Sequence, residues 1–382
     1  RDRSPSRGLG DVYKRQLQKP LSSVAGKLAH DEMLFIIIHQ IYELWFKQIL
    51  HELDSVLNLF QKESINERHM GIIVSQLERI IVIQKILIEQ ITVIETMSPA
   101  DFLEFRDLLA PASGFQSIQF RLLEIKMGLK KGKRILFEKQ AFSSALDVKE
   151  KTILEEAEKE PSLFDGVNRW LERTPFLDFD GFNFWDSYRK AVEENLKKQE
   201  QAFKSNQISD EETKRLQDSY ENTRKNFDAI VNEKKHDEMV ETGQRDLSYK
   251  SMQAALLIFL YRDQPVLHLP YRLLTGLIDM DEYLTSWRYR HALMAHRMIG
   301  RKTGTGGSSG YSYLRTTVER HKVFSDFTNL TTFFLPRSRL PVLSKDIQNK
   351  LGFYYSQLKA VSYTHLRAHE TDSYLVCRLL LE

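Results

Sequence analysis

Three polar side chains with binding chemistry lie in otherwise apolar helical sequence. His291 lies in "SWRYRHALMAHRM" and His39 in "FIIIHQIYELWF", whereas Arg106 follows "DFLEF". A histidine in such surroundings either hydrogen-bonds within the core or opens onto a pocket, because a buried polar ring without a partner is unfavourable. An arginine there pairs with a protein carboxylate or with the carboxylate of a ligand. These three residues are therefore the candidates for binding or catalysis.

The spacing of the eleven histidines is not typical of a zinc site. His291 and His296 are five residues apart, so they lie on different faces of a helix, unlike the i,i+4 pair of zinc proteases. Haem needs only a single axial histidine, which an all-helical protein can supply. Trp287 and Ala295 lie one turn on either side of His291 and share its face, so a flat macrocycle could approach there. The alternative is a core histidine bonded to a carbonyl oxygen.

The stretch "GTGGSSG" at 304–310 is a glycine-rich loop between two helical segments. Such loops let the backbone approach a bound group closely. A Walker phosphate loop would need lysine after its last glycine, whereas Tyr311 follows Gly310. A dinucleotide-binding loop would follow a strand, whereas the segment before this loop is helical. The pattern excludes both nucleotide-binding motifs and leaves the bound group open.

Helical hydrophobic spacing predicts the elements that position these residues. Apolar residues recur every three or four positions, prolines are scarce, and no alternating strand pattern or internal repeat is present. The first half of 31–61 is apolar nearly all round, so we expect it to be buried on most sides. The sequence predicts an all-α protein with one domain at 17–360. Its predicted helices span 31–61, 70–97, 98–114, 115–134, 185–240 with a break near 205–210, 248–263, 270–300 and 313–335.

The two ends of the chain lack this pattern. Residues 1–16 ("RDRSPSRGLGDVYKRQ") and 361–382 ("VSYTHLRAHETDSYLVCRLLLE") resemble foreign, adaptor-derived sequence, and we exclude them from the predicted domain. The single cysteine, Cys377, lies in the second segment, so no disulfide framework is expected. His365 and His369, which imitate an i,i+4 metal pair, lie there too.

The composition describes a soluble globular protein, with 42% hydrophobic and 28% charged residues. The net charge of +3 gives no reason to expect nucleic acid or an anionic membrane as a partner. No signal peptide is apparent, and the longest uninterrupted apolar run near the start, 33–38, is far too short to span a membrane. We therefore expect a cytoplasmic protein.

Four long segments together resemble the tryptophan 2,3-dioxygenase family, haem enzymes that open the indole ring of L-tryptophan. The segments are ordered as in that family and spread over nearly all of 17–360, and the first has a form typical of bacterial members. They are "HDEMLFIIIHQIYELWFKQILHELDSV" (30–56), "SPADFLEFRDLLAPASGFQSIQFRLLE" (98–124), "ERTPFLDFDGFNFWDSYRK" (172–190) and "WRYRHALMAHRMIGRKTGTGGSSGYSYLRTTVERHKVF" (287–324).

The resemblance implies the cofactor and the reaction. His291 matches the proximal ligand of a ferrous haem b iron, with L-tryptophan and O2 as substrates. The implied product is N-formyl-L-kynurenine, in the first step of the kynurenine pathway. His39 matches the distal histidine that faces the indole nitrogen, and it is the implied catalytic residue. Phe35 in the same motif matches an aromatic wall of the indole pocket.

The resemblance also implies which residues hold the amino-acid end of the substrate. Arg106 in "DFLEFR" matches the arginine that clamps the carboxylate, and Phe102 lines the pocket one turn earlier. Thr305 matches the threonine that binds the ammonium and carboxylate end. The glycine loop is thus implied to be a lid over the substrate, since closing loops exclude water. Ser113 in "PASGFQS" matches a serine near the haem edge.

The family assembles as homotetramers, in which tyrosines just before "LQKPLSS" reach into a neighbouring subunit's pocket. Residues 1–16 stand in that place here, so we expect a loosened substrate pocket. Two other functions compete: a non-catalytic haem-binding sensor or carrier with the same fold, and a helical scaffold without cofactor. The joint presence of Arg106, Thr305 and a glycine lid favours the dioxygenase, because a carrier needs none of them.

Overall fold

The computed structural model describes the chain in stretches separated by gaps. They are residues 19–62, 64–109, 116–134, 146–174, 178–179 and 182–205, some positions between 215 and 229, and then 230–300, 302, 311–343 and 345–351. Contacts group the chain into two units, 1–342 and 343–382. The described helix of the second unit is α16 (Lys345–Leu351). The predicted boundaries at 16/17 and 360/361 lie outside the described residues and stay predictions.

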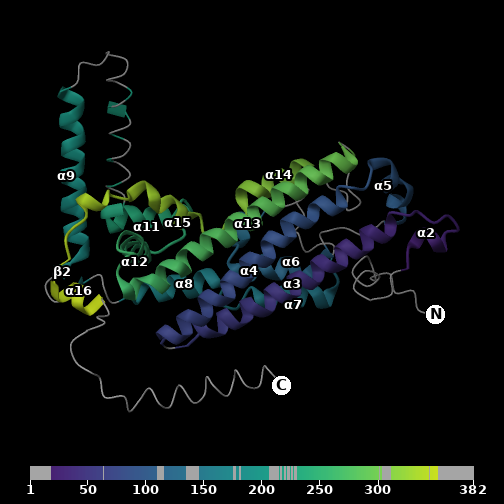
Figure 1. Ribbon diagram of the computed structural model, residues 1–382, viewed down its shortest axis with the longest axis horizontal. Coiled ribbons are helices and arrows are strands. Elements are labelled where there is room, and N and C mark those ends of the chain that lie inside the picture. Colours follow the sequence, from purple (N-terminus) through teal and green to yellow (C-terminus); the bar gives the residue numbers. More distant parts are fainter. Residues whose placement is uncertain are drawn as a thin grey trace, which may run out of the picture. The chain divides into compact units, whose positions relative to one another are not determined.

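Three long helices carry the core of the first unit: α3 (Glu32–Phe60), α4 (Glu67–Ile94) and α13 (His268–Ile299). α4 packs against both α3 and α13 (Figure 1). Gln84 of α4 donates a buried hydrogen bond to the Met280 carbonyl oxygen of α13 at 3.0 Å. The other buried side chains of α4 are apolar and recur at the spacing of one helix face. The least exposed of them are Ile73, Leu77, Ile80, Leu87 and Ile91.

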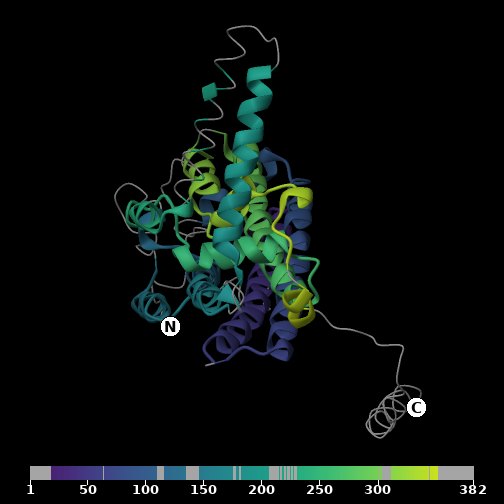
Figure 2. The same cartoon turned by 90° about the vertical axis from the view of Figure 1, so that its left-hand side faces the viewer.

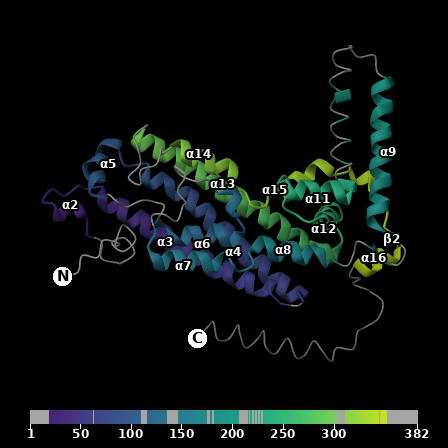
Figure 3. The ribbon, with the colours of Figure 1, turned by 180° about the vertical axis from the view of Figure 1, so that it is seen from behind.

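Shorter helices cover these three. α6 packs against α3 and α7 against α6 (Figure 3), α14 lies along α13, and α9 is one uninterrupted helix (Figure 2). These helices are α2 (Leu21–Val24), α5 (Pro99–Arg106), α6 (Ile118–Met127), α7 (Val148–Ala157), α8 (Leu163–Glu172), α9 (Phe184–Ser205), α11 (Glu233–Glu241), α12 (Tyr249–Leu260), α14 (Tyr311–Arg320) and α15 (Ser325–Asn329).

One small β-hairpin is present among the described residues. Strands β1 (Asp178–Phe179) and β2 (Phe182–Asn183) pair antiparallel, with Phe179 opposite Phe182. Strands of two residues are too short to produce an alternating pattern in the sequence. The prediction of an all-α protein is confirmed by the helices that make up the rest of the described elements.

Local sequence signals set the ends of the two short helices beside the candidate site. The Ser98 hydroxyl accepts from the Asp101 amide at the start of α5, and the Ser117 hydroxyl accepts from the Phe120 amide at the start of α6. These are N-caps, which satisfy amides that have no partner within the helix. α6 ends at Gly128, whose φ of +117° favours glycine.

Gly128→Ala is expected to lower the free energy of unfolding by about 1–3 kcal/mol. Besides the positive φ, an added Cβ would lie 2.6 Å from the Cβ of Phe164. Urea denaturation measures the change. Gly132→Ala is the matched control, because a Cβ there meets nothing within 4 Å; its effect is expected to stay within about 0.5 kcal/mol. Equal losses in the two variants would contradict this account of the turn.

The prediction of one helix over 313–335 is wrong. α14 ends at Arg320, and α15 begins only at Ser325. Between them, the buried carboxylate of Asp281 on α13 accepts hydrogen bonds from the amides of Val323 and Phe324, at 3.0–3.1 Å. Amides taken by a side chain are not available to continue a helix, so the tertiary contact breaks the periodic segment.

The first half of α3 is less buried than the sequence predicts. Ile37 is 39% exposed and Leu44 is 66% exposed, so the expectation of burial on most sides is wrong. By length and composition alone, α3 is also long and apolar enough to cross a membrane. Its longest uninterrupted apolar run, 33–38, is much shorter than a membrane span. Its buried Glu52 carboxylate, paired with Arg79 at 2.7 Å, and its packing against α4, α6 and α8 are typical of a core helix of a globular domain.

Candidate active site

A cavity of about 340 Å³ lies where α3, α5, α6, α13 and α14 meet. Its walls are mostly apolar with a few polar groups, as is typical of ligand sites. Five of the seven predicted site residues line it, namely Phe35 and His39 of α3, Phe102 and Arg106 of α5, and His291 of α13. Ser113 and Thr305 lie outside the described residues, so their positions stay predictions.

On the α13 side, His291 stands beside a parallel aromatic ring. Its imidazole lies 5.3 Å from the ring of Trp287, centroid to centroid, with 9° between the planes. Burial, together with repulsion from His39, lowers the pKa of His291 to about 4. The imidazole is therefore neutral at pH 7, the form in which histidine has a lone pair for a metal ion.

On the α3 side, the tautomer of His39 follows from its hydrogen bond. Nδ1 lies 2.7 Å from the carbonyl oxygen of Phe35, and the two rings lie 4.1 Å apart. A carbonyl oxygen only accepts, so Nδ1 carries the proton. Burial lowers the pKa of His39, while the Phe35 carbonyl and the charge of Glu43 oppose that effect. A neutral His39 thus has its lone pair on Nε2, which can accept from an N–H donor.

Arg106 is positioned by the two phenylalanines that anchor α5. Phe102 and Phe105 are buried in an apolar cluster with residues of α3 and α13. The ring of Phe35 lies 5.8 Å from that of Phe102 and 5.6 Å from that of Phe105. Arg106 follows in the last turn of the helix and lines the cavity. The packing therefore puts a guanidinium on the same cavity as both histidines.

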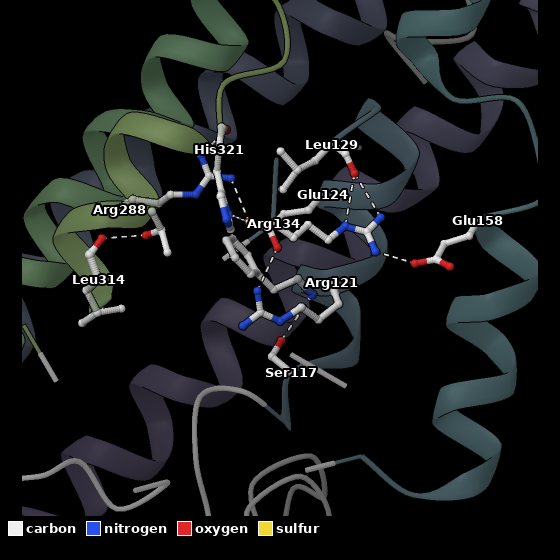
Figure 4. A network of polar contacts seen from close by, with 11 residues as sticks. Ser117, Arg121, Glu124, Leu129, Arg134, Glu158, Arg288, Leu314 and His321 are labelled. Carbon is white, nitrogen blue, oxygen red and sulfur yellow. Dashed lines mark hydrogen bonds and ion pairs between the residues drawn. The ribbon is translucent and has the colours of Figure 1, made fainter. Parts of the chain in front are cut away.

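Sequence reasoning missed one polar wall, which we call the arginine cluster: Arg121 and Glu124 of α6, Arg288 of α13 and His321 after α14. The Glu124 carboxylate accepts from Arg121 Nη1 at 2.8 Å and from Arg288 Nη2 at 3.0 Å. His321 Nδ1 lies 3.0 Å from the same carboxylate. Arg121, Glu124 and Arg288 are nearly fully buried, and all four residues line the cavity. Figure 4 shows them converging on Glu124.

Glu124 is held in its charged form by its neighbours. Burial alone would raise the pKa of its carboxyl, but Arg121, His321 and Arg288 lower that pKa well below the ordinary value. A carboxyl whose pKa is lower in the folded state contributes stability above its unfolded pKa of about 4.3. That contribution is lost as the pH falls through the folded-state pKa.

Glu124→Gln is expected to lower the free energy of unfolding at pH 7 by about 3–5 kcal/mol, because it leaves two buried guanidinia without a carboxylate. Glu95→Gln is the matched control. Its partner Arg290, at 3.0 Å, is 38% exposed, so less than about 1 kcal/mol is expected. Urea denaturation at pH 7 compares the two. A Glu124 variant as stable as the control would contradict the buried ion-pair assignment.

The residues on the cavity fit a haem group. A single neutral imidazole is enough to hold haem iron, and His291 could supply it; flat aromatic and apolar walls suit a macrocycle. The Nε of Arg288 is buried and has no hydrogen-bond partner in the described part of the chain, as expected for a donor that faces a ligand. Within the described residues, no three His, Cys, Asp or Glu side chains gather as a site for a free metal ion.

Comparison with known proteins places the chain in one family. The family described as "Tryptophan 2,3-dioxygenase" matches residues 11–334. The tryptophan 2,3-dioxygenase of Bdellovibrio bacteriovorus is 52% identical over 88% of this chain and 94% of that protein. Those of Alteromonas mediterranea and Dictyostelium discoideum are 47% and 44% identical, over 86% and 90% of this chain and 91% and 86% of those proteins. The chain belongs to the tryptophan 2,3-dioxygenase family.

Proposed function

We propose that the chain is a haem-dependent dioxygenase that inserts both atoms of O2 across the indole C2–C3 bond of L-tryptophan. The product is N-formyl-L-kynurenine, and the reaction opens tryptophan degradation by the kynurenine pathway. The observation that carries the proposal is the joint placement of His291, His39 and Arg106 on one apolar cavity. Family membership, with relatives of that name at 44–52% identity, supports the same reaction.

The two histidines bind different groups: His291 binds the haem iron, and His39 binds the indole of the substrate. His291, neutral because burial lowers its pKa, would hold the iron of a haem b group. When bound, that group supplies the chemistry of O2 activation. His39 donates from Nδ1 to the Phe35 carbonyl oxygen, so its Nε2 accepts the indole N–H. This hydrogen bond orients the indole, and the ring of Phe35 provides an aromatic wall beside it.

The polar end of the substrate is recognised by Arg106. A guanidinium binds a carboxylate through two parallel N–H···O bonds, which fixes orientation as well as position. Thr305 and the glycine lid would add contacts to the ammonium and carboxylate groups, as the family resemblance implies. Indole itself lacks both charged groups and would make neither contact, so the site selects the amino acid.

Apolar side chains form much of the wall beside the reacting groups. Ile38, Met97, Phe102 and Met298 line the cavity. In a dry site, the Arg106–carboxylate contact and the His39–indole hydrogen bond are stronger than they would be in water. The protein therefore positions the substrate in a low-dielectric environment, and its own side chains form no covalent bond with the substrate.

The assembly and location belong to the same proposal. We place the chain in a cytoplasmic homotetramer. Exposed apolar side chains on the long helices are what subunit contacts would cover. They include Leu44 of α3, Val82 and Val93 of α4, and Tyr289 and Leu293 of α13.

A non-catalytic haem carrier is the weaker alternative, because it has no need of Arg106 on the haem cavity. Turnover of L-tryptophan under 18O2, followed by mass spectrometry of the product, separates the two functions. The dioxygenase is expected to place two labelled atoms in each product molecule. A haem spectrum with no labelled product would favour the carrier instead.

A further inference from the structure

A buried carboxylate at the start of α3 is not among the groups that the proposed reaction uses. Glu32 is the first residue of α3 and is fully buried. Its Oε1 accepts from the Leu21 amide at 2.6 Å, and its Oε2 accepts from the Ser22 amide at 2.9 Å. A buried carboxylate is unfavourable unless hydrogen bonds satisfy it. These two amides do so, and they open the first turn of α2, whose N-cap residue Pro20 makes no side-chain cap.

A second buried side chain closes the turn between α2 and α3. The Ser22 hydroxyl, 1% exposed with its residue, accepts from the Ala29 amide at 2.9 Å. Gly26 within that turn has a φ of +88°, in the left-handed region that favours glycine. Glu32 and Ser22 therefore hold residues 20–31 in one folded segment, which we call the N-terminal hook.

The N-terminal hook packs against the chain that carries Arg106. α2 contacts η1 (Asp107–Leu109), the turn that directly follows Arg106 (Figure 1). Ala29 packs against the apolar cluster that anchors α5. Because α5 has only eight residues, too few for a stable isolated helix, its position is set by what packs against it. No residue of the hook lines the cavity, so the hook acts on a ligand only through the elements that it contacts.

An ion pair at the surface also joins the N-terminal hook to α5. Lys27 Nζ lies 2.6 Å from the Glu104 carboxylate, but the two side chains are 84% and 54% exposed. Exposed ion pairs contribute little, since solvent screens them. The buried Glu32 carboxylate is therefore the group that holds the hook in place.

We propose that Glu32 is a positioning residue for the substrate carboxylate. By holding the N-terminal hook against η1, it fixes the Arg106 guanidinium in the orientation that binds the carboxylate. This inference rests on the proposed function, because it takes Arg106 as the carboxylate-binding residue. Small displacements of a group that positions substrate weaken its contact strongly. A loosened hook thus weakens binding of the amino-acid end, while the indole end stays bound at His39.

Glu32→Gln in the haem-loaded protein is the first test. Glutamine keeps the size but turns an NH2 donor toward one of the two amides, so one hydrogen bond is lost. The dissociation constant of L-tryptophan, measured by anaerobic equilibrium dialysis, is expected to rise about three- to tenfold. Haem content and the dissociation constant of tryptamine, which has no carboxylate, are expected to stay the same.

Glu150→Gln is the matched control for that variant. The Glu150 carboxylate also accepts from an amide at the start of a helix, that of Asp147 at 3.3 Å in an exposed hydrogen bond. Glu150 belongs to α7 and is not among the residues that line the cavity. Its affinity for L-tryptophan is expected to equal that of the unmodified protein.

Ser22→Ala tests the same hook with Glu32 intact, and it decides the question where Glu32→Gln does not fold. It removes the hydrogen bond to the Ala29 amide, so the dissociation constant of L-tryptophan is expected to rise about two- to fivefold. Ser23→Ala is its control, because the Ser23 hydroxyl is exposed and donates to the Pro20 carbonyl oxygen at 2.7 Å. Unmodified affinity is expected in that control.

A double-variant cycle separates positioning of Arg106 from a general loss of structure. If Glu32 acts through Arg106, Glu32→Gln has no further effect on L-tryptophan affinity once Arg106 is replaced by leucine. Losses that add in the double variant, or an equal loss of tryptamine binding, would overturn the proposal. Unmodified L-tryptophan affinity in the folded hook variants, checked by far-UV circular dichroism, would overturn it too.

The two proposals fail in different ways. Failure of the dioxygenase proposal appears in the unmodified protein, as haem retained and L-tryptophan not converted. Failure of the positioning role appears in the variants, while the unmodified protein still forms product. Equilibrium dialysis measures binding without turnover, so the role of Glu32 is tested in both cases.

Discussion

His291→Ala is expected to abolish haem retention. The substitution removes the one neutral imidazole that α13 presents to the cavity, and with it the bond to the iron that we propose. Haem content per mole of purified protein, measured as the pyridine haemochrome, tests this. Far-UV circular dichroism is expected to show the helical content unchanged, because alanine is a good helix former at this position.

His296→Ala is the matched control for that variant. His296 lies on the same helix but is exposed, and its ring packs against Tyr311 at 4.5 Å rather than lining the cavity. Its haem content is expected to equal that of the unmodified protein. Full haem content in the His291 variant would contradict the ligand assignment, and haem loss in both variants would point to damage of α13 instead.

Arg106→Leu is expected to raise the KM for L-tryptophan roughly 10- to 100-fold, because a charge-assisted contact with the substrate carboxylate is lost. Haem content is expected to stay the same. Tryptamine, which lacks the carboxylate, gives the sharper comparison: its binding is expected to be similar in the variant and the unmodified protein. Steady-state kinetics and ligand-induced changes in the haem spectrum measure these effects.

Arg272→Leu controls for loss of an arginine as such. Arg272 pairs with Glu78 at the surface, and both side chains are substantially exposed. Its KM is expected to match that of the unmodified protein. Unaltered affinity for L-tryptophan in the Arg106 variant, or an equal loss of tryptamine binding, would remove Arg106 from carboxylate recognition.

Helices with one clear apolar face could be predicted from the sequence. The expected helices at 31–61, 70–97 and 270–300 correspond to α3, α4 and α13, because the hydrophobic period is that of a helix face. The short helices α7 and α8 were not predicted. α7 has a weak period because Leu154 is its one buried residue, whereas α8 has a clear apolar face, with Leu163, Val167 and Leu171 buried at intervals of four residues, and the sequence analysis missed that signal. The break after α14 depends on Asp281, which is distant in the sequence, so no local pattern reveals it.

The residues of the candidate site also divide into those that the sequence predicts and those that it does not. His39, His291 and Arg106 stand out as polar residues in apolar helices, and the structure places all three on one cavity. The arginine cluster was missed because charged side chains are usually exposed. A usable signal existed: Leu277, Asp281, Leu284 and Arg288 follow one another at spacings of three or four residues, which puts Asp281 and Arg288 on the buried face of α13.

The most direct measurement is product formation by the purified protein. The protein is reduced anaerobically, mixed with air-saturated buffer and L-tryptophan, and followed by the absorbance of N-formylkynurenine. The account predicts product at catalytic amounts, dependent on both L-tryptophan and O2, and none from the His291 variant. A haem-loaded, folded protein that forms no product would contradict the proposed function.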